Sequence, residues 1–207
     1  MTSFLEYCFL HWGAHAKRDL SDSARSLAVA LFREYDNHVS LKLVMMEHVG
    51  LEFRHFRNDY WDSPFSGLNC ASFFGISDLV SALIKMECYD INRGFSGHTP
   101  LTWASRNGHA EVVKILLDRK EVHPDKPSEL GCAPLSWAAA CGHEGVVKIL
   151  LREEEVNPNK PDNDGRTPLL LAAEDGHAGV VKILLGQKEV DPYKSDHTGR
   201  TPVAYAV

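Results

Sequence analysis

Residues 97–117 read GHTPLTWASRNGHAEVVKILL, and this stretch returns twice in recognisable form. Residues 131–151 read GCAPLSWAAACGHEGVVKILL, and residues 165–185 read GRTPLLLAAEDGHAGVVKILL. A leading Gly, a Pro-Leu pair, a Gly-His pair and the run Val-Val-Lys-Ile-Leu-Leu all keep a spacing of 34 residues. Several markers in one register indicate an internal repeat, which is the pattern of a solenoid protein.

Two further copies flank these three. After Gly199, a partial copy covers residues 201–207. A degenerate copy precedes the other units, and its Gly75 stands 33 residues before Gly108. We therefore divide the chain into residues 1–62, which are not repeats, and a repeat region at 66–207. The predicted units of that region are 66–98 (degenerate), 99–132, 133–166, 167–200 and 201–207 (partial).

Each unit is expected to contain two short helices. Thr99 can cap the first helix while Pro100 occupies its first turn, where no backbone N–H is needed. Gly108 suits the end of that helix because glycine takes the left-handed conformation without steric cost. The run 112–117 supplies the buried face of the second helix. The segment 121–127, rich in Pro and Asp, is predicted to be a loop or hairpin.

Helices this short require neighbours, because isolated helices below roughly 12–15 residues are marginal in water. The predicted fold is therefore an all-α stack of helix pairs. Small residues recur where first helices would meet, at Ala71, Ala104, Ala138, Ala172 and Ala206. The large residues that precede the last four of them are predicted to fill the space between layers; they are Trp103, Trp137, Leu171 and Tyr205.

Residues 1–62 show three amphipathic patterns instead of the repeat. Apolar residues recur at helical spacing within 4–16, 24–35 and 41–56. We expect a helical bundle that caps the first repeat and shields it from water. The alternative, that this segment is a helical linker to another domain, stays open.

Composition restricts the partners and the compartment. A net charge of -6 and the lack of a Lys/Arg run argue against a nucleic-acid partner. No apolar run approaches the roughly 20 residues that span a bilayer, so no membrane partner is expected. The five cysteines form no CxxC pair, which favours reduced thiols. We expect a cytoplasmic protein, with the nucleus as an alternative, that is a monomer or part of a larger chain.

Candidate catalytic and metal-binding residues are few. His11 and His15 stand one helical turn apart, but no third ligand is identifiable, and Trp12 stands where a zinc protease carries its glutamate. Cys141 lies close to His143 in sequence, yet the equivalent residues of the other copies are not thiols, and an activated thiolate needs a positioned base. We expect no enzyme activity, no metal and no cofactor.

With these residues in view, the region 66–207 resembles the ankyrin repeat, whose pattern is G-x-T-P-L-H-x-A-A-x-x-G-H followed by V-V-x-x-L-L. The resemblance implies an ankyrin solenoid in which finger tips and first-helix ends line one concave surface. One departure is that the family's His after Thr-Pro-Leu is replaced by Thr102, Ser136, Leu170 and Ala204. Because that His ties neighbouring repeats in the family, the resemblance implies looser ties here.

A second, shorter resemblance concerns residues 1–18. The stretch from Phe4 to His15 is similar to the helical linker that precedes the ankyrin array in fungal NACHT-type NTPases. The similarity implies that the chain is a piece or a descendant of a larger signalling NTPase. No G-x-x-x-x-G-K-[ST] stretch is present, so the nucleotide-binding part is absent from this sequence.

Comparison of the copies separates a constant framework from variable positions. The framework includes His109, His143 and His177, which match a structural histidine of the ankyrin family. The variable positions flank the leading Gly or end the first helix. The candidate partner-binding residues among them are Phe95, Ser96, His98, Arg106, Asn107, Glu129, Leu130, Ala140, Asn163, Asp164, Arg166, Glu174, Asp175, His197 and Arg200. A rigid scaffold with a variable face is typical of binding, although drift at exposed positions gives the same pattern.

The leading hypothesis is a non-enzymatic protein-interaction module whose partner the sequence does not identify. The competing hypothesis is a sensor or regulatory fragment of a NACHT-type NTPase. The last copy, residues 201–207, ends inside its first helix. A stack that ends in this way exposes apolar surface, so we expect either that the natural array continues or that these residues fray.

Overall fold

The repeat region folds as an all-α stack of paired helices. The computed structural model describes residues 26, 30, 66–86, 90–94 and 97–205. Its helices, in chain order, are α4 (Gly67–Phe74), α5 (Ser77–Lys85), α6 (Pro100–Arg106), α7 (Ala110–Leu117), α8 (Pro134–Ala140), α9 (Glu144–Leu150), α10 (Pro168–Glu174) and α11 (Ala178–Leu185). One 3-10 turn, η4 (Pro202–Tyr205), follows them. The predicted bundle in residues 1–62 lies outside the described residues, apart from two isolated positions.

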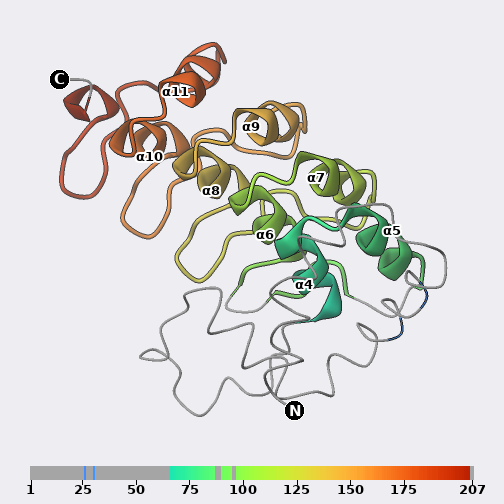
Figure 1. Cartoon of the computed structure of the whole chain (residues 1–207). Coiled ribbons are helices and arrows are strands. Elements are labelled where there is room, and N and C mark those ends of the chain that lie inside the picture. Colours follow the sequence, from blue (N-terminus) through green and yellow to red (C-terminus); the bar gives the residue numbers. More distant parts are fainter. Residues whose placement is uncertain (1–25, 27–29, 31–65, 87–89, 95–96, 206–207) are drawn as a thin grey trace, which may run out of the picture.

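The helices form two rows, as Figure 1 shows. The first helices of the repeats, α4, α6, α8 and α10, pack side by side in one row, and η4 packs against α10. The second helices, α5, α7, α9 and α11, form the other row. The hairpins that join successive repeats project from the side of the first row (Figure 1). This arrangement confirms the predicted stack of helix pairs.

The first helices begin as the Thr-Pro pattern predicts. The Thr99 Oγ1 atom accepts a hydrogen bond from Thr102 N at 3.2 Å, and Pro100 occupies the first turn of α6. Thr167 caps α10 in the same way. Ala133 opens α8 without a side-chain cap, so α8 lacks a contribution that is typically about 1 kcal/mol.

Each first helix ends in a glycine turn. In α6, His109 N donates to Ala104 O at 2.9 Å and Gly108 N donates to Ser105 O at 3.3 Å. This pair of bonds satisfies two carbonyls that the helix itself leaves without partners. Gly108 has a φ of 74°, in the left-handed region. The glycine therefore ends the helix and sets the direction in which the second helix leaves.

The core lies between the two rows and is continuous along the stack. The second helices contribute Val113, Val147 and Leu116, all with 0% exposure. The first helices contribute leucines such as Leu135 and Leu169, both 1% exposed, together with the small alanines that let neighbouring helices approach. Burial of one such leucine stabilises the fold by about 1.5–3 kcal/mol. No single pair of helices encloses this core, so each repeat depends on its neighbours.

The Gly-His pairs join one repeat to the next. A Cβ atom at Gly142 would lie 2.6 Å from the His177 Nδ1 atom, so only glycine leaves room for the histidine of the following repeat. The His177 Nε2 atom donates to Ala140 O at 2.9 Å, a carbonyl near the end of the preceding first helix. His143 bonds to Arg106 O at 2.9 Å, and His109 lies 2.8 Å from Phe73 O, in the same relation.

These bonds are important because this chain lacks the His that follows Thr-Pro-Leu in the ankyrin pattern. The Thr102 hydroxyl stays within its own repeat, 3.1 Å from Thr99 Oγ1. Ties between repeats come instead from the Gly-His histidines and from the connecting loops. In the loops, Asn159 accepts from Asp191 N at 2.8 Å, and Lys126 donates to Asn92 O at 2.9 Å. The repeats are thus hydrogen-bonded to one another in spite of the replacement.

Candidate functional site

The finger hairpins of the last two full repeats are fixed by an Asp-Arg pair. The Asp162 Oδ1 atom accepts from the backbone N of Asp164 at 3.0 Å and of Arg166 at 2.8 Å. Its Oδ2 atom accepts from the Arg166 Nε and Nη2 atoms, each at 2.9 Å. The Asp162 side chain is 1% exposed and the Arg166 side chain 29%. Asp196 and Arg200 repeat this geometry.

The carboxyl of Asp196 is held in its ionised form. Burial opposes ionisation, but hydrogen bonds from the Thr198 hydroxyl, the Arg200 backbone and guanidinium, and the Thr198 backbone outweigh it. These donors hold the pKa of the Asp196 carboxyl well below its usual range. The finger of the preceding repeat lacks this pair, because Ser128 and Cys132 occupy the equivalent positions. There, burial first and the nearby Asp162 second raise the pKa of the Cys132 thiol to about 12.

Successive fingers are joined through their backbones. Asn163 N donates to Leu130 O at 3.0 Å, and His197 N donates to Asp164 O at 2.9 Å. The Asn163 side chain adds a bond to Glu129 O at 2.8 Å. The backbones of the finger tips at 129–131, 163–164 and 197 are therefore hydrogen-bonded from one finger to the next.

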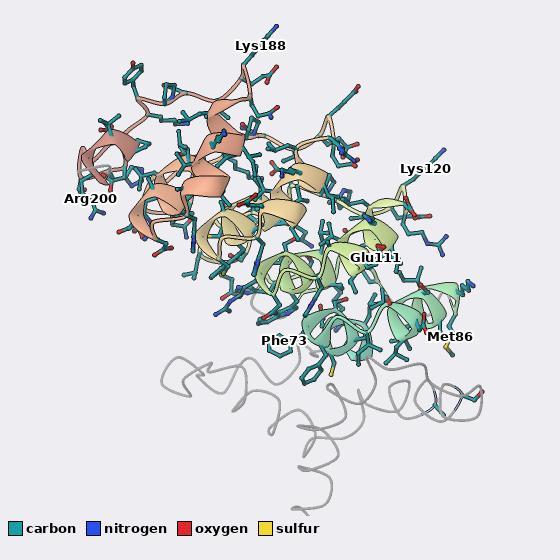
Figure 2. The ribbon with its side chains drawn as sticks, turned by 45° about the horizontal axis from the view of Figure 1, so that its top comes forward. Phe73, Met86, Glu111, Lys120, Lys188 and Arg200 are labelled. Carbon is teal, nitrogen blue, oxygen red and sulfur yellow. The ribbon has the colours of Figure 1, made fainter. Side chains whose placement is uncertain are left out.

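Finger bases and first-helix ends come together on one side of the stack. The Arg166 Nη1 atom lies 3.6 Å from Glu174 Oε2, and Arg200 Nη1 lies 4.0 Å from Glu174 Oε1. Figure 2 places Phe73 and Arg200 along one edge of the stack and Lys120 and Lys188 along the other. We name the first side the inner face and define it by residues 103–107, 129–131, 137–141, 163–166, 171–175 and 197–200.

An aromatic cluster occupies the end of the inner face nearest α4. The His98 ring stacks on the Trp103 ring with centroids 4.9 Å apart, and lies 5.3 Å from the Trp137 ring. The Arg106 guanidinium lies over the Trp137 ring, 4.7 Å from its centroid, and 5.8 Å from that of Trp103. A cation at this distance over an indole face is attracted by its quadrupole. In the preceding repeat Phe73 takes the place of Arg106, and its ring contacts the Trp103 ring edge-on, with centroids 5.5 Å apart.

Next to this cluster, charges of opposite sign flank one thiol. Burial raises the pKa of the Cys141 thiol, and among the charges near it Arg106 lowers that pKa while Asp175 raises it. Arg106 and Asp175 therefore both influence the thiol of Cys141, the C-cap residue of α8. A raised pKa disfavours the thiolate, so the thiol lacks the activation that a nucleophile needs.

Several candidate binding residues have structural partners. His98 is only 6% exposed, so little of its side chain is accessible in the described structure. Arg166, Arg200 and Glu174 belong to the network of the fingers. Others also have structural contacts: the Asn107 side chain bonds to Trp103 O, the Asn163 side chain to Glu129 O, and the His197 ring covers Gly165. Phe95 and Ser96 lie outside the described residues.

The remaining candidates leave their side chains to solvent on the inner face. Leu130 is 58% exposed, and Glu129 and Asp175 are exposed. Asp164 has a side chain that is 75% exposed, although it pairs with Arg166 at 3.2 Å. Arg106 and Ala140 are half-buried at the ends of α6 and α8. The open part of the candidate site is therefore smaller than the variable set and centres on these six residues.

Sequence reasoning missed the role of the tryptophans. Trp137 was expected to fill the space between layers, but it is only half-buried and supports Arg106 on the inner face. Trp103 is fully buried within the cluster, and Leu171 is 6% exposed. The repeat register held the relevant signal, because Phe73 and Arg106 both stand two residues before the Gly of a Gly-His or equivalent position, and each contacts the tryptophan of the following repeat.

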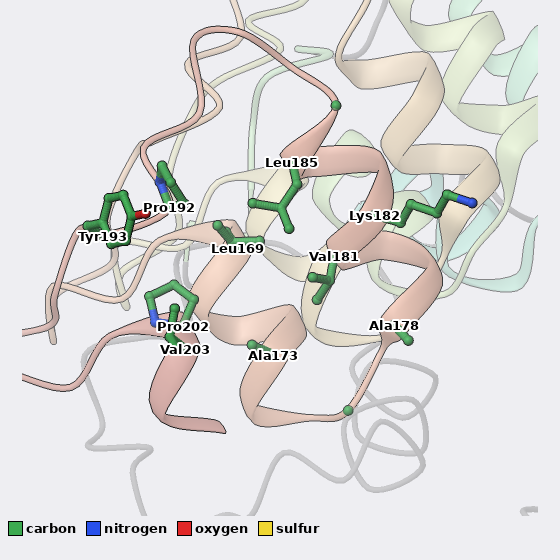
Figure 3. Close-up of a pocket in the computed structure, with 12 residues that line it drawn as sticks. Leu169, Ala173, Ala178, Val181, Lys182, Leu185, Pro192, Tyr193, Pro202 and Val203 are labelled. Carbon is green, nitrogen blue, oxygen red and sulfur yellow. The ribbon is translucent and has the colours of Figure 1, made fainter. Parts of the chain in front are cut away.

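A groove of 710 Å³ lies at the α11 end of the described stack (Figure 3). Its lining is mainly apolar and includes Val181, Leu185 and Tyr193. Leu185 is 52% and Tyr193 75% exposed. Val147, which is equivalent to Val181, is fully buried one repeat earlier, where α9 packs against α11. The groove is therefore the stacking face of the last helix pair and follows from the repeat geometry.

The described residues contain no group of three or more His, Cys, Asp or Glu side chains placed to hold a metal ion. None of the helices in that part of the chain is both long and apolar enough to cross a bilayer. His11 and His15, the pair considered for zinc, lie outside it.

These features define a repeat protein with a bonded framework and one face of varied side chains. A family model described as ankyrin repeats (3 copies) matches residues 68–162 and 154–207, and the chain belongs to that family. Ankyrin repeats are typically protein–protein interaction modules and typically non-catalytic. A search of curated proteins found no match.

Proposed function

We propose that residues 66–207 form a non-enzymatic module that binds a protein partner through the inner face. The observation that carries the proposal is the separation of roles among the side chains. Constant residues such as His143 and Gly108 hold the repeats together. The solvent-facing variable residues, among them Leu130 and Asp175, gather on one face. A rigid scaffold that presents varied side chains meets the physical requirement for a specific interface.

A pull-down with matched variants tests this proposal. The inner variant combines Arg106→Ala, Leu130→Ala and Asp175→Ala, none of which removes a hydrogen bond or ion pair described between repeats. The outer variant combines exposed charged residues of the second-helix side, Lys120→Ala, Arg152→Ala and Lys188→Ala. Loss of captured proteins with the inner variant alone supports the proposal. An inner variant that keeps every partner, while the outer variant loses them, overturns it.

Arg166 and Glu174 are poor choices for that experiment. Replacement of Arg166 would leave the buried Asp162 carboxylate without its guanidinium partner. A loss of binding would then report a distorted finger as well as a lost contact. Binding variants are therefore taken from residues outside the finger network.

The similarity of residues 1–18 to a NACHT-type linker supports a second candidate, a sensor or regulatory part of a larger NTPase. That stretch lies outside the described residues, so the candidate rests on sequence alone. A transcript that carries no upstream NTPase domain would remove it. Binding at the inner face is compatible with either setting.

A further inference from the structure

The inner face carries a cation and an anion that the framework does not use. Arg106 has no carboxylate within ion-pair distance in the described part of the chain; its guanidinium contacts are the two indole faces. Asp175, at the C-cap of α10, is exposed and forms no ion pair among the described residues. By contrast, Arg166 and Arg200 are both paired within their own fingers. Arg106 and Asp175 are therefore open to charged groups of a partner.

The position of the Arg106 guanidinium over the Trp137 ring suits it to a planar anion. A guanidinium that lies over an aromatic ring keeps its N–H donors in the plane, where a carboxylate can accept two of them. Trp137 also restricts the side chain, so less conformational entropy is lost on binding. The pair Arg106 and Trp137 thus resembles a fixed receptor for a carboxylate next to an apolar group.

The two charges are separated along the row of first helices. Arg106 ends α6 and Asp175 caps α10, with α8 packed between those helices. Neighbouring helix axes lie about 8–10 Å apart, so two steps span roughly 16–20 Å. An extended chain rises about 3.3 Å per residue and covers this span in about five or six residues.

We propose that the inner face recognises an extended segment of a partner protein that carries an Asp or Glu for Arg106 and a Lys or Arg for Asp175, about five or six residues apart. The proposal rests on the proposed function, and adds to it the charges of the partner segment and the direction in which that segment lies. The segment crosses α8 between its two charged contacts. The acidic residue lies toward α6 and the basic residue toward α10.

Selection from a displayed library of random twelve-residue peptides, on the immobilised full chain, tests the proposal. We expect recovered peptides to carry an acidic and a basic residue at the stated spacing. Arg106→Ala should weaken their binding about tenfold, because it removes the guanidinium that lies over the Trp137 ring. Asp175→Asn should weaken it severalfold. The matched control Arg152→Ala, an exposed arginine after α9, should leave binding unchanged.

A charge exchange makes the test specific. Arg106→Glu should abolish binding, and a peptide whose acidic residue is replaced by Lys should then bind that variant. Equal urea midpoints for the variants and the native chain exclude a folding effect. Peptides that depend on Leu130 but on neither Arg106 nor Asp175 overturn this inference and leave the proposed function in place. Recovery of no peptide that depends on the inner face also overturns this inference, whereas the pull-down with the inner and outer variants decides the proposed function.

Discussion

The ring of His143 occupies the space in which a side chain at Gly108 would stand: a Cβ built on Gly108 falls 2.6 Å from His143 Nδ1. The same ring donates through Nε2 to the carbonyl of Arg106, two residues before that glycine. The contact between Gly108 and His143, which joins two repeats, thus lies within two residues of Arg106 on the inner face. The position of the Arg106 backbone is set by the following repeat, which gives the proposed receptor a rigid base.

Two glycines that differ only in their neighbours provide the first prediction. Gly142 and Gly176 have φ angles of 74° and 73°, so alanine is strained equally at both, by roughly 1–2 kcal/mol. The Gly142 site is filled by His177, whereas nothing described lies within 4 Å of a Cβ at Gly176. Gly142→Ala should therefore lose a further 1–3 kcal/mol or so in urea unfolding. Equal losses would show that the joint does not depend on close approach.

Removal of a joint histidine provides the second prediction. His143→Ala removes the bond to Arg106 O and should lower the free energy of unfolding by about 1–3 kcal/mol. His123→Ala is the matched control, because His123 is exposed and, in the described part, only its backbone atoms are hydrogen-bonded. Thermal and urea unfolding of the two variants gives the comparison. A control as unstable as His143→Ala would contradict the assignment.

The Asp-Arg finger provides the third prediction. Arg166→Met leaves the Asp162 carboxylate, which is 1% exposed, with two backbone donors and the weak thiol donor of Cys132. We expect a loss of about 1.5–3 kcal/mol in the free energy of unfolding, the usual range for a hydrogen bond to a charged group. Arg152→Met, on an exposed arginine, should change it by less than about 0.5 kcal/mol. A loss of similar size in both variants would mean that the finger does not require the pair.

The pH dependence of stability follows from Asp196. The pKa of its carboxyl is lower in the folded chain than in the unfolded chain, where it is about 3.9. Between these values the unfolded state binds more protons, so stability rises with pH through that window. The contribution is complete above the unfolded pKa and is lost as pH falls through the folded pKa. Asp196→Asn should flatten the stability profile below about pH 4 relative to the native chain; superimposable slopes would refute this.

The repeated markers predicted the stack because they report local requirements. Thr99 and Pro100 start a helix and Gly108 ends it through backbone preferences that hold in any context. The same markers do not reveal that His143 fills the space above Gly108, because that contact joins residues 35 positions apart. The stacking geometry had to be known before the glycine could be recognised as a packing position as well as a helix end.

The variable positions were harder to interpret, because variation between copies has two physical origins. Arg166 and Cys132 differ, but both side chains bond to Asp162: Arg166 Nε donates to its Oδ2 atom within the same finger, and the Cys132 thiol donates to that atom from the preceding finger. Leu130 and Asp175 vary without such a partner. Sequence comparison of the copies gives both kinds of position the same appearance. Only burial and bonding distinguish a compensated framework pair from an open contact residue.

Hydrogen exchange of the full chain, with and without a captured partner, tests whether the inner face is the binding surface. We expect exchange to slow at the first-helix ends and finger tips, residues 103–107, 129–131, 137–141, 163–166 and 171–175. Exchange should stay unchanged on the exposed side of α7 and α9. Slowing confined to the second helices, with the inner face unaffected, would show that the partner binds elsewhere.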